Sequence, residues 1–473
     1  MNFLELKKSF DKGLFINAFL LALLYFLWIR FSEDYQYLII PIALLCPYFF
    51  VFARKNYLPF LLLMYLVLVG EISPSLRAFV HIVGFVSLSI YLFNNKEKIN
   101  PVIYSIDKRI KRFLFLFFII LFATSIFSKI PMKGLEILLK EIYFFFILFV
   151  FYTSLRLNNN PKDILFILML SATIMSISSI INLSDFNIIE LISSGSSSFR
   201  SGGLLSNVNA LSGYLVIAFP IFVAYIFNNK NNYSKYIYIF GLVILIMGVL
   251  STISRSAGLS IISGVLFFAY NLNRKLFWRI LIIIFLLVLI IVLSPFSEFI
   301  LTAFRLEQGF SQRDLLWELS ANMFKHNWLF GVGPGLWGIE MFNYSPVLQD
   351  SFVGYLFYDV NKLTEGFNNS HNYYLVFSTD MGISGLFLSI YLPFVFFSIA
   401  IENLRFSRLS GSEVYIINLS LVTVGVSMFI RAFFEGISII TFGWIAIDLP
   451  FWSVFAILIY YNRLYKEKLQ GEN

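Results

Sequence analysis

Long apolar runs recur along the whole chain, and they constrain its fold more than any other feature. Each run has roughly 17 residues or more, enough for an α-helix to cross a ~30 Å hydrocarbon core. A transmembrane β-barrel would instead show alternating segments of ~10 residues, and the sequence lacks such a pattern. The runs therefore predict an all-α polytopic membrane protein with about 12–14 transmembrane helices.

We interpret residues 1–473 as a single transmembrane domain. The predicted spans lie near residues 13–31, 35–53, 57–73, 78–94, 113–130, 137–156, 164–183, 204–227, 235–253, 256–272, 276–296, 380–401, 413–431 and 437–461. The first of them has no small-residue cleavage site after it, so we expect a retained helix and not a signal peptide. The sequence has one cysteine, Cys46, so no disulfide can form within the chain. Cys46 lies inside a predicted span.

Composition agrees with a membrane protein. The chain is 59% hydrophobic and 13% charged, which is too little charge to cover a soluble protein of this size. Lys and Arg concentrate in alternate short turns, such as "RKNY", "NRK" and the tail "RLYKEK". Positive residues favour cytoplasmic loops, so we expect both termini in the cytoplasm. The net charge of +8 then reflects topology and not a nucleic-acid-binding face.

The largest polar segment is residues 297–370, which this orientation makes an extracytoplasmic loop between transmembrane helices. Apolar residues from Leu316 to Phe324 recur at helical spacing and predict an amphipathic helix. Ser311, with Asp314 three residues later, is typical of a helix N-terminus. The sequence "GVGPG", Gly331 to Gly335, predicts a tight turn and lacks the spacing of a dinucleotide-binding motif.

One of the three histidines, His371, stands at the end of this loop in "SHNYYLVFSTDMGISGLF". A neutral imidazole can take a proton from a hydroxyl near pH 7, so His371 is a candidate general base. The alternative is that His371 only caps or anchors a helix at the membrane interface. We interpret His81 and His326 as structural.

Two arginines on the same predicted side are candidate anion ligands. Arg200 follows "SSGSSSF", and Arg255 lies in "STISRSAGLSI" between two spans with almost no loop. A guanidinium so close to the hydrocarbon is costly without a partner. The alternatives are snorkelling to lipid headgroups or pairing with an acid. Small neighbours leave room for a ligand, and two such arginines would suit a pyrophosphate.

Several other chemistries have no support in the sequence. It contains no HExxH, no paired cysteines and no acid-rich metal motif, so we expect no metal and no cofactor. A Walker motif is also missing, so we do not expect ATP as the energy source.

Four segments together resemble the O-antigen ligase and polymerase family. They are "FRSGGLLSNVNALSGYL", "STISRSAGLSI", "QRDLLWELSANMF…WLFGVGPGLW" and "SHNYYLVFSTDMGISGLF". They occur in the family's order, the long loop lies in the family's place, and the similarity covers roughly residues 195–400. The resemblance implies a membrane-embedded glycosyltransferase that uses neither nucleotide sugar nor, in the ligases, metal.

The resemblance also implies substrates and roles. The donor would be a glycan on undecaprenyl pyrophosphate, and the acceptor a sugar hydroxyl on the extracytoplasmic face. Arg200 and Arg255 would hold the pyrophosphate during catalysis, and His371 would act as base on the acceptor or orient it. Further substrate-binding candidates lie in the same motifs: Ser254, Ser256, Asn209 and Asn372. Membrane lipids are expected partners, and nucleic acid is not.

Three activities stay open. A polymerase would add the glycan to another lipid-linked repeat unit, and the span count favours it. A ligase would add it to the lipid A core of lipopolysaccharide. A flippase for the same lipid-linked glycan is a more distant alternative, because few charges lie in mid-span and the largest loop is outside. A peptidoglycan polymerase of the shape-determining class does not match the motifs around His371 and Arg255.

Overall fold

The structure is a computed structural model. It describes residues 58, 61–62, 65–66, 74–159, 161–184, 200–229, 231–294, 313–345 and 369–471. The predicted spans near 13–31 and 35–53, most of 57–73, and Cys46 lie outside these residues.

The described part of the chain is all helical and contains no strand. Its α-helices are α4 (Pro74–Asn94), α5 (Lys96–Ser105), α6 (Lys108–Ile126), α7 (Pro131–Asn158), α8 (Pro161–Ser184), α10 (Val208–Asn228), α11 (Asn232–Thr252), α12 (Arg255–Leu272), α13 (Arg274–Leu293), α15 (Arg313–His326), α16 (Trp337–Glu340), α19 (Tyr373–Ser410), α20 (Ser412–Arg431) and α21 (Ile445–Gly471). Two 3-10 helices, η3 (Gly203–Leu205) and η5 (Met341–Tyr344), complete the set.

Seven of the described helices are long and apolar enough to cross a membrane: α8, α10, α11, α13, α19, α20 and α21. This confirms the prediction of an all-α polytopic membrane protein. Helices α4, α6, α7 and α12 lie where further spans were predicted.

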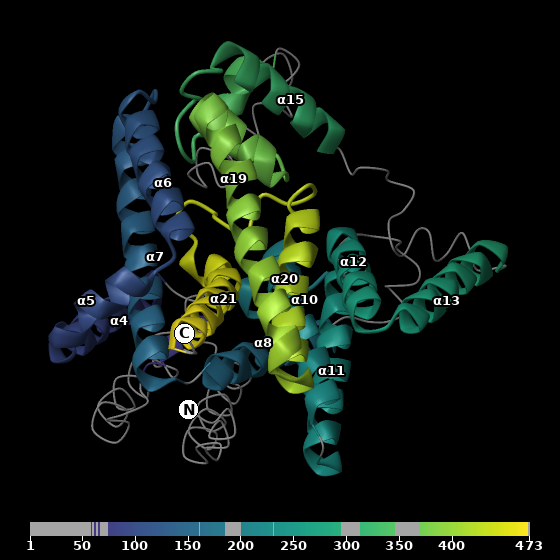
Figure 1. The fold of residues 1–473 in the computed structure, drawn as a ribbon. Coiled ribbons are helices and arrows are strands. Elements are labelled where there is room, and N and C mark those ends of the chain that lie inside the picture. Colours follow the sequence, from purple (N-terminus) through teal and green to yellow (C-terminus); the bar gives the residue numbers. More distant parts are fainter. Residues whose placement is uncertain are drawn as a thin grey trace.

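The bundle is organised around α10, α19, α20 and α21 (Figure 1). Helix α20 packs against α10, α12 and α19, while α6 and α7 pack together and contact α19 and α21 respectively. Aromatic rings fill the centre: the Phe396 ring lies 4.9 Å from that of Phe455 and 5.6 Å from that of Phe451. This central packing fixes the helix ends that carry the site.

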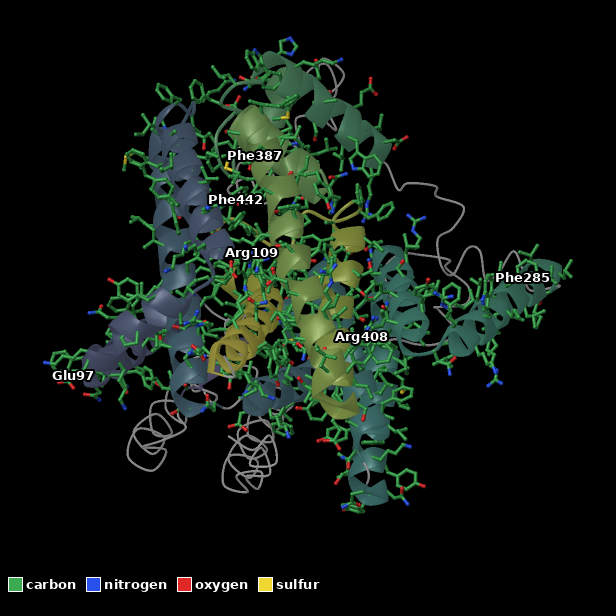
Figure 2. All side chains as sticks on the ribbon, in the orientation of Figure 1. Glu97, Arg109, Phe285, Phe387, Arg408 and Phe442 are labelled. Carbon is green, nitrogen blue, oxygen red and sulfur yellow. The ribbon has the colours of Figure 1, made fainter. Side chains whose placement is uncertain are left out.

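Helix α13 differs from the others because none of its residues is buried. Its side chains, including Phe285, extend away from the bundle (Figure 2). Its residues from Ile280 to Leu293 are all apolar, and an apolar helix surface with no protein around it is suited to contact with lipid.

Two helices of the described part start seven residues or more from the predicted start of their span. Residues 437–444 are not helical, so the last span begins at Ile445 and not near 437. Ser438, Phe442 and Gly443 adopt positive φ angles there, and the Thr441 amide donates to Asp448 Oδ2 (2.6 Å). Hydropathy cannot distinguish such a buried apolar loop from a helix. Non-helical backbone is tolerated at membrane depth where protein buries it.

Helix α19 begins seven residues before the predicted 380, at Tyr373, and Gly382 interrupts it with a φ of 64°. The "GVGPG" segment lies against this break. The Val332 amide donates to the Thr379 carbonyl (2.9 Å), and the Ile383 amide donates to the Trp328 carbonyl (2.7 Å). The polar loop thus hydrogen-bonds with main-chain groups that a continuous helix would have used.

The predicted amphipathic helix is confirmed as α15, and the predicted turn at Gly331–Gly335 is confirmed by positive φ angles at its three glycines. Helix α15 packs on a small hydrophobic core that is separate from the core of the bundle and contains Met323 and Trp337. The indole Nε1 of Trp337 donates to the Ser320 hydroxyl (2.9 Å). The predicted N-cap Ser311 lies outside the described residues. Figure 1 shows α15 above the start of α19, at what we call the α15 end of the bundle.

Candidate active site

A cavity of about 160 Å³ opens at the α15 end. Its walls come from the starts of α7, α10 and α19, from the turn at Gly335, and from the loop between α20 and α21. Its polar lining residues are Lys133, Glu136, Lys140, Asn207, Asn209, Asn369, His371, Asp380, Glu435 and Thr441. Trp337, Phe442 and Trp444 add aromatic surface. Polar groups that converge in an aromatic pocket are typical of a small-molecule site.

His371 lies in this cavity, two residues before α19 begins. Its φ of +49° is unusual for a residue with a side chain. The turn is fixed by its neighbours: Asn369 accepts the His371 amide (2.8 Å), and Asn372 caps α19 through the Tyr374 and Leu375 amides. His371 is therefore held just before the N-terminus of α19, and its side chain is 38% exposed.

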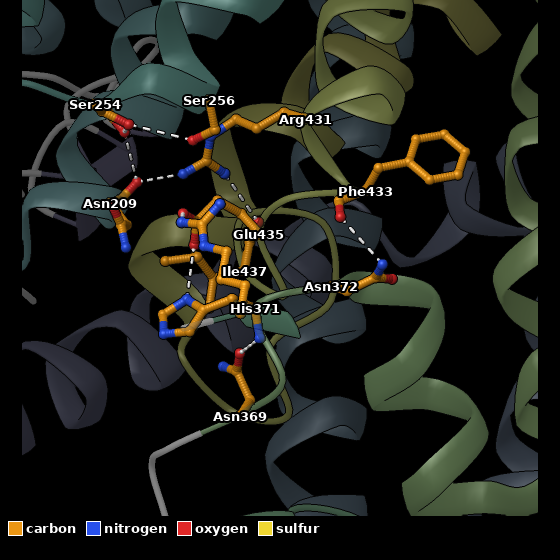
Figure 3. Close-up of polar contacts among 12 residues, drawn as sticks. Asn209, Ser254, Ser256, Asn369, His371, Asn372, Arg431, Phe433, Glu435 and Ile437 are labelled. Carbon is orange, nitrogen blue, oxygen red and sulfur yellow. Dashed lines mark hydrogen bonds and ion pairs between the residues drawn. The ribbon is translucent and has the colours of Figure 1, made fainter. Parts of the chain in front are cut away.

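The His371 ring is paired with Glu435 from the α20–α21 loop. His371 Nδ1 lies 3.1 Å from Glu435 Oε2 (Figure 3). When Nδ1 carries the proton and donates to this carboxylate, Nε2 is left as an acceptor. A Cβ at the next residue, Gly436, would lie 2.8 Å from Asn369 Oδ1, so glycine permits this close approach.

Two permanent cations and the His371 ring surround the Glu435 carboxylate, which is 1% exposed. They are His371, Arg431 and Arg313, the last of which donates Nη2 to Glu435 Oε1 from α15. Burial raises the pKa of Glu435, but the hydrogen bond and attraction of His371 and the charges of Arg431 and Arg313 outweigh it. The pKa of Glu435 consequently lies below its usual range. Glu435 is thus a carboxylate at neutral pH and can stabilise a protonated His371.

Arg431, at the end of α20, is fully buried. Its Nη2 donates to the Asn209 carbonyl (2.5 Å) and its Nη1 to the Ile437 carbonyl (3.3 Å), while Nε has no hydrogen-bond partner among the described residues. Gly213 on α10 makes room for it, because a Cβ there would lie 2.9 Å from Nη1. Arg431 therefore places a fixed positive charge between α10 and the Glu435 loop.

Asn209 connects the predicted arginine region to the cavity. Its side-chain oxygen accepts from Arg200 Nη2 (3.4 Å), its carbonyl accepts from Arg431, and the residue lines the cavity beside His371. Arg200 Nε also donates to the Thr252 carbonyl (2.8 Å) at the end of α11. Arg200 is thus fixed next to the cavity wall without being part of its lining.

The "STISRSAG" motif forms the junction of α11 and α12. Arg255 is the first residue of α12 and is half-buried. Ser254 occupies the N-cap position of α12, but its side chain makes no capping hydrogen bond with the described residues. Its hydroxyl lies 3.2 Å from that of Ser256. Ser212 of α10 donates to Ser254 (3.1 Å). A hydroxyl network therefore joins the starts of α10 and α12.

The structure accordingly brings most of the predicted residues to one end of the bundle. His371 and Asn209 line the cavity, and Arg200, Ser254 and Ser256 lie in the network that reaches Asn209. The Asn372 side chain is buried and is used by the fold: it caps α19 and donates to the Phe433 carbonyl (3.0 Å). Its predicted role in substrate binding stays a prediction.

Sequence reasoning missed Glu435, Arg431 and Arg313. The first two stand four residues apart in the otherwise apolar "FIRAFFEGISII", and ionisable residues in such a setting are a functional signal. Arg313 had no signal of its own, because an arginine on an amphipathic helix is usually solvated. Among the described residues, no group of three or more His, Cys, Asp or Glu could hold a metal ion.

Comparison with known proteins adds a family to this geometry. Residues 240–390 match the family described as O-antigen ligase. This stretch is similar to the O-antigen ligase family. A search of the curated proteins gave no match. The chain is a multi-pass membrane protein, and the family implies a membrane glycosyltransferase-type enzyme that acts on lipid-linked glycans in polysaccharide biosynthesis.

The stretch that matches the O-antigen ligase family contributes Arg255, Arg313 and His371 to the site. Arg200, Asn209, Arg431 and Glu435 lie outside this stretch, yet they contact residues of the same site. The cavity is therefore completed by helices that flank the matched region.

Proposed function

We propose that this protein transfers a glycan from undecaprenyl pyrophosphate to a sugar hydroxyl on the extracytoplasmic face of the bacterial inner membrane. The single observation that carries the proposal is the pairing of His371 with the buried Glu435 inside a polar and aromatic cavity. Together with the O-antigen ligase match, it gives the family's chemistry a base and a cavity. The N- and C-termini would both be cytoplasmic.

In this proposal His371 Nε2 removes the proton of the acceptor hydroxyl. The oxygen then attacks the anomeric carbon of the donor sugar, a new glycosidic bond forms, and the bond to the pyrophosphate oxygen breaks. The pyrophosphate leaves with the bonding electron pair, still attached to its lipid. Glu435 stabilises the imidazolium that forms, since a negative charge at 3.1 Å from Nδ1 favours it.

Arg200 and Arg255 stabilise the negative charge that grows on the departing pyrophosphate. Fixed cations cost no reorganisation during the reaction and act strongly where water is excluded. Cleavage of the sugar–pyrophosphate bond supplies the driving force, so the transfer needs neither ATP nor a cofactor.

For the acceptor, we favour a second lipid-linked repeat unit, which makes the protein a polymerase. The description of the matching family supports the alternative, a ligase that transfers to the lipid A core. The two activities differ in product: a polymerase extends the chain on the lipid carrier, and a ligase joins it to lipopolysaccharide.

The test is glycan transfer by purified protein with a lipid-linked donor and each of the two acceptors. The variant H371Q keeps polarity and is expected to lower product formation by ~10²–10⁴-fold, because it lacks the imidazole base. Donor binding, measured separately, is expected to be largely unchanged. The matched control is H326Q, because His326 is exposed and lies outside the cavity lining.

Normal product formation by H371Q would remove the base role. Loss of both product and donor binding would instead assign His371 to the pyrophosphate site. Transport of intact lipid-linked glycan across vesicles, without any transfer, would favour the flippase.

A further inference from the structure

We propose that Arg313 of the polar loop is a positioning residue for the reaction: it holds Glu435 so that this carboxylate presents its second oxygen to His371. The inference deepens the proposed function and rests on it for its catalytic meaning. The site is then complete only when α15 is docked on the bundle.

The contacts divide the Glu435 carboxylate between two partners. Arg313 Nη2 donates to Oε1, and His371 Nδ1 lies 3.1 Å from Oε2. A carboxylate held at one oxygen by a guanidinium has its plane restricted, so the other oxygen stays in the direction of the imidazole. The Glu435 side chain is 1% exposed and Arg313 is 19% exposed, so water screens the pair weakly.

Helix α15 makes a second contact with the same turn. Trp317 lies four residues after Arg313, on the same face of α15, and its indole Nε1 donates to the Ser370 carbonyl (3.1 Å). Ser370 directly precedes His371. One face of α15 thus contacts both partners of the His371–Glu435 pair. Trp317 holds the backbone just before His371, and Arg313 holds the Glu435 carboxylate.

The charges that face Glu435 make Arg313 significant. His371 approaches from the start of α19, Arg431 from the end of α20, and Arg313 from α15. Around the same cavity, α7 adds Lys133, Glu136 and Lys140, and α19 adds Asp380. Arg431 donates to main-chain carbonyls and no hydrogen bond of described residues joins it to Glu435. Among these groups, Arg313 and His371 are the ones that hydrogen-bond the carboxylate.

The chain contains a matched control. Lys129, in the turn between α6 and α7, pairs with Glu340 of the same polar loop (2.5 Å) and donates to Tyr344 (3.1 Å). Glu340 is 7% exposed, so this pair is buried to a similar degree on its acid side. Both ion pairs connect the loop to the bundle, but only the pair of Arg313 contacts the partner of His371.

The experiment compares R313Q with K129Q in the full-length protein in lipid nanodiscs, with ¹⁵N-labelled histidine. H81Q and H326Q in the background leave His371 as the one labelled ring. The first readout is the NMR signal of the hydrogen-bonded Nδ1 proton of His371, which needs no substrate. The second is the pH dependence of glycan transfer. R313K, which keeps the charge but not the planar guanidinium, is the second variant.

We expect R313Q to lose the His371 Nδ1 signal and to shift the acidic limb of the pH–rate profile to higher pH by roughly one unit, because the hydrogen-bonded pair of His371 and Glu435 takes up a proton more easily without the neighbouring cation. R313K should give an intermediate result, and K129Q should match the parent in both readouts. E435Q should lose the signal outright.

An unchanged His371 signal in folded R313Q or R313K would overturn the inference, as would equal loss of the signal in K129Q. Because the signal is independent of turnover, a parent protein that shows it but transfers no glycan would contradict the proposed function and leave the positioning contact in place.

Discussion

Two clusters of charged residues lie at opposite ends of this bundle, and they differ in burial and in balance. The α15-end cluster contains His371, Glu435, Arg313 and Arg431. The opposite-end cluster contains Asp107, Arg109, Glu402 and Lys466. The first two lie at the start of α6, and the other two lie near the C-terminal ends of α19 and α21. Arg109 is labelled in Figure 2.

The opposite-end cluster is neutral and closed. Its two acids face two bases: Arg109 donates to both oxygens of Glu402 (2.7 and 2.8 Å), and Lys466 lies 3.1 Å from the same acid. Its side chains are 12–35% exposed, and none of them lines the cavity. Such a cluster joins three helices and leaves no charge for a ligand.

The α15-end cluster is unbalanced and buried. Two permanent cations, Arg313 and Arg431, face one acid, and both Arg431 and Glu435 are almost completely buried. The cluster borders the cavity through His371 and Glu435. The comparison teaches that a count of ion pairs does not identify a site in this protein. Burial without charge balance, beside a cavity, does.

The strongest test of this difference is Arg431→Met. Removing one member of a buried charged group costs ~3–5 kcal/mol, since the groups it satisfied stay buried. Here the Ile437 carbonyl would lose its Arg431 donor, and the Asn209 carbonyl would keep only the Ser212 hydroxyl as a side-chain donor. We expect a decrease of about that size in the free energy of unfolding, measured by denaturant titration in mixed micelles. The control R408M changes an exposed arginine of α19 and should stay within ~0.5 kcal/mol of the parent. Equal values for the two variants would contradict the burial argument.

The sequence was sufficient to predict the long apolar helices and insufficient to predict the non-helical loop beside the site. Runs of apolar residues predicted α8, α10, α11, α13 and α20 within a few residues, because burial in lipid or protein imposes the same composition along the whole helix. Residues 437–444 are equally apolar but adopt a loop, and the reason is local: positive φ angles and the hydrogen bonds of Thr441 to Asp448. Composition carries no record of such contacts.

The same limit applied to the site. His371 was identifiable because a histidine between a polar loop and an apolar helix is unusual. Its partner was not, because Glu435 lies 64 residues away in sequence and only packing brings the two together. The i, i+4 pair Arg431 and Glu435 in an apolar segment was a usable signal that the prediction did not use.

A second test separates arginines by their place in the structure. Arg255 and Arg274 are each the first residue of a helix, α12 and α13. Arg255 is half-buried next to the Ser254–Ser256 hydroxyls, whereas Arg274 is exposed at the other end of α12. If Arg255 holds pyrophosphate, R255Q should lose charge-assisted hydrogen bonds of ~1.5–3 kcal/mol, or roughly ten- to a hundred-fold in transfer rate. R274Q should transfer at the parent rate. Equal rates in both variants would leave Arg255 without a role in donor binding.

A third test uses the lowered pKa of Glu435. Its ordinary value is 4.5, and in the folded protein it lies lower. The stabilisation from its charged form is therefore complete above about pH 4.5 and is lost as the pH falls through the lower folded value. We expect the difference in unfolding free energy between the parent and E435Q to shrink as the pH falls below about 4.5. Each unit of lowering corresponds to ~1.4 kcal/mol. A difference that does not change down to pH 3 would mean that the cations leave Glu435 unaffected.

The smallest effect is expected at the opposite end. Arg109 is 24% exposed, and its partner Glu402 is 34% exposed and keeps Lys466 (3.1 Å) and Asn462 (2.9 Å) if Arg109 is replaced. Ion pairs of this exposure contribute ~0.2–1 kcal/mol, so R109Q should lower the free energy of unfolding by about that amount. Glycan transfer should be unchanged, because no residue of the opposite-end cluster lines the cavity of the proposed site. The decisive measurement is the transfer rate of R109Q beside R313Q at equal amounts of folded protein. A loss of rate in R109Q as large as in R313Q would show that the two ends are coupled, and the contrast between a closed cluster and an open one would then fail.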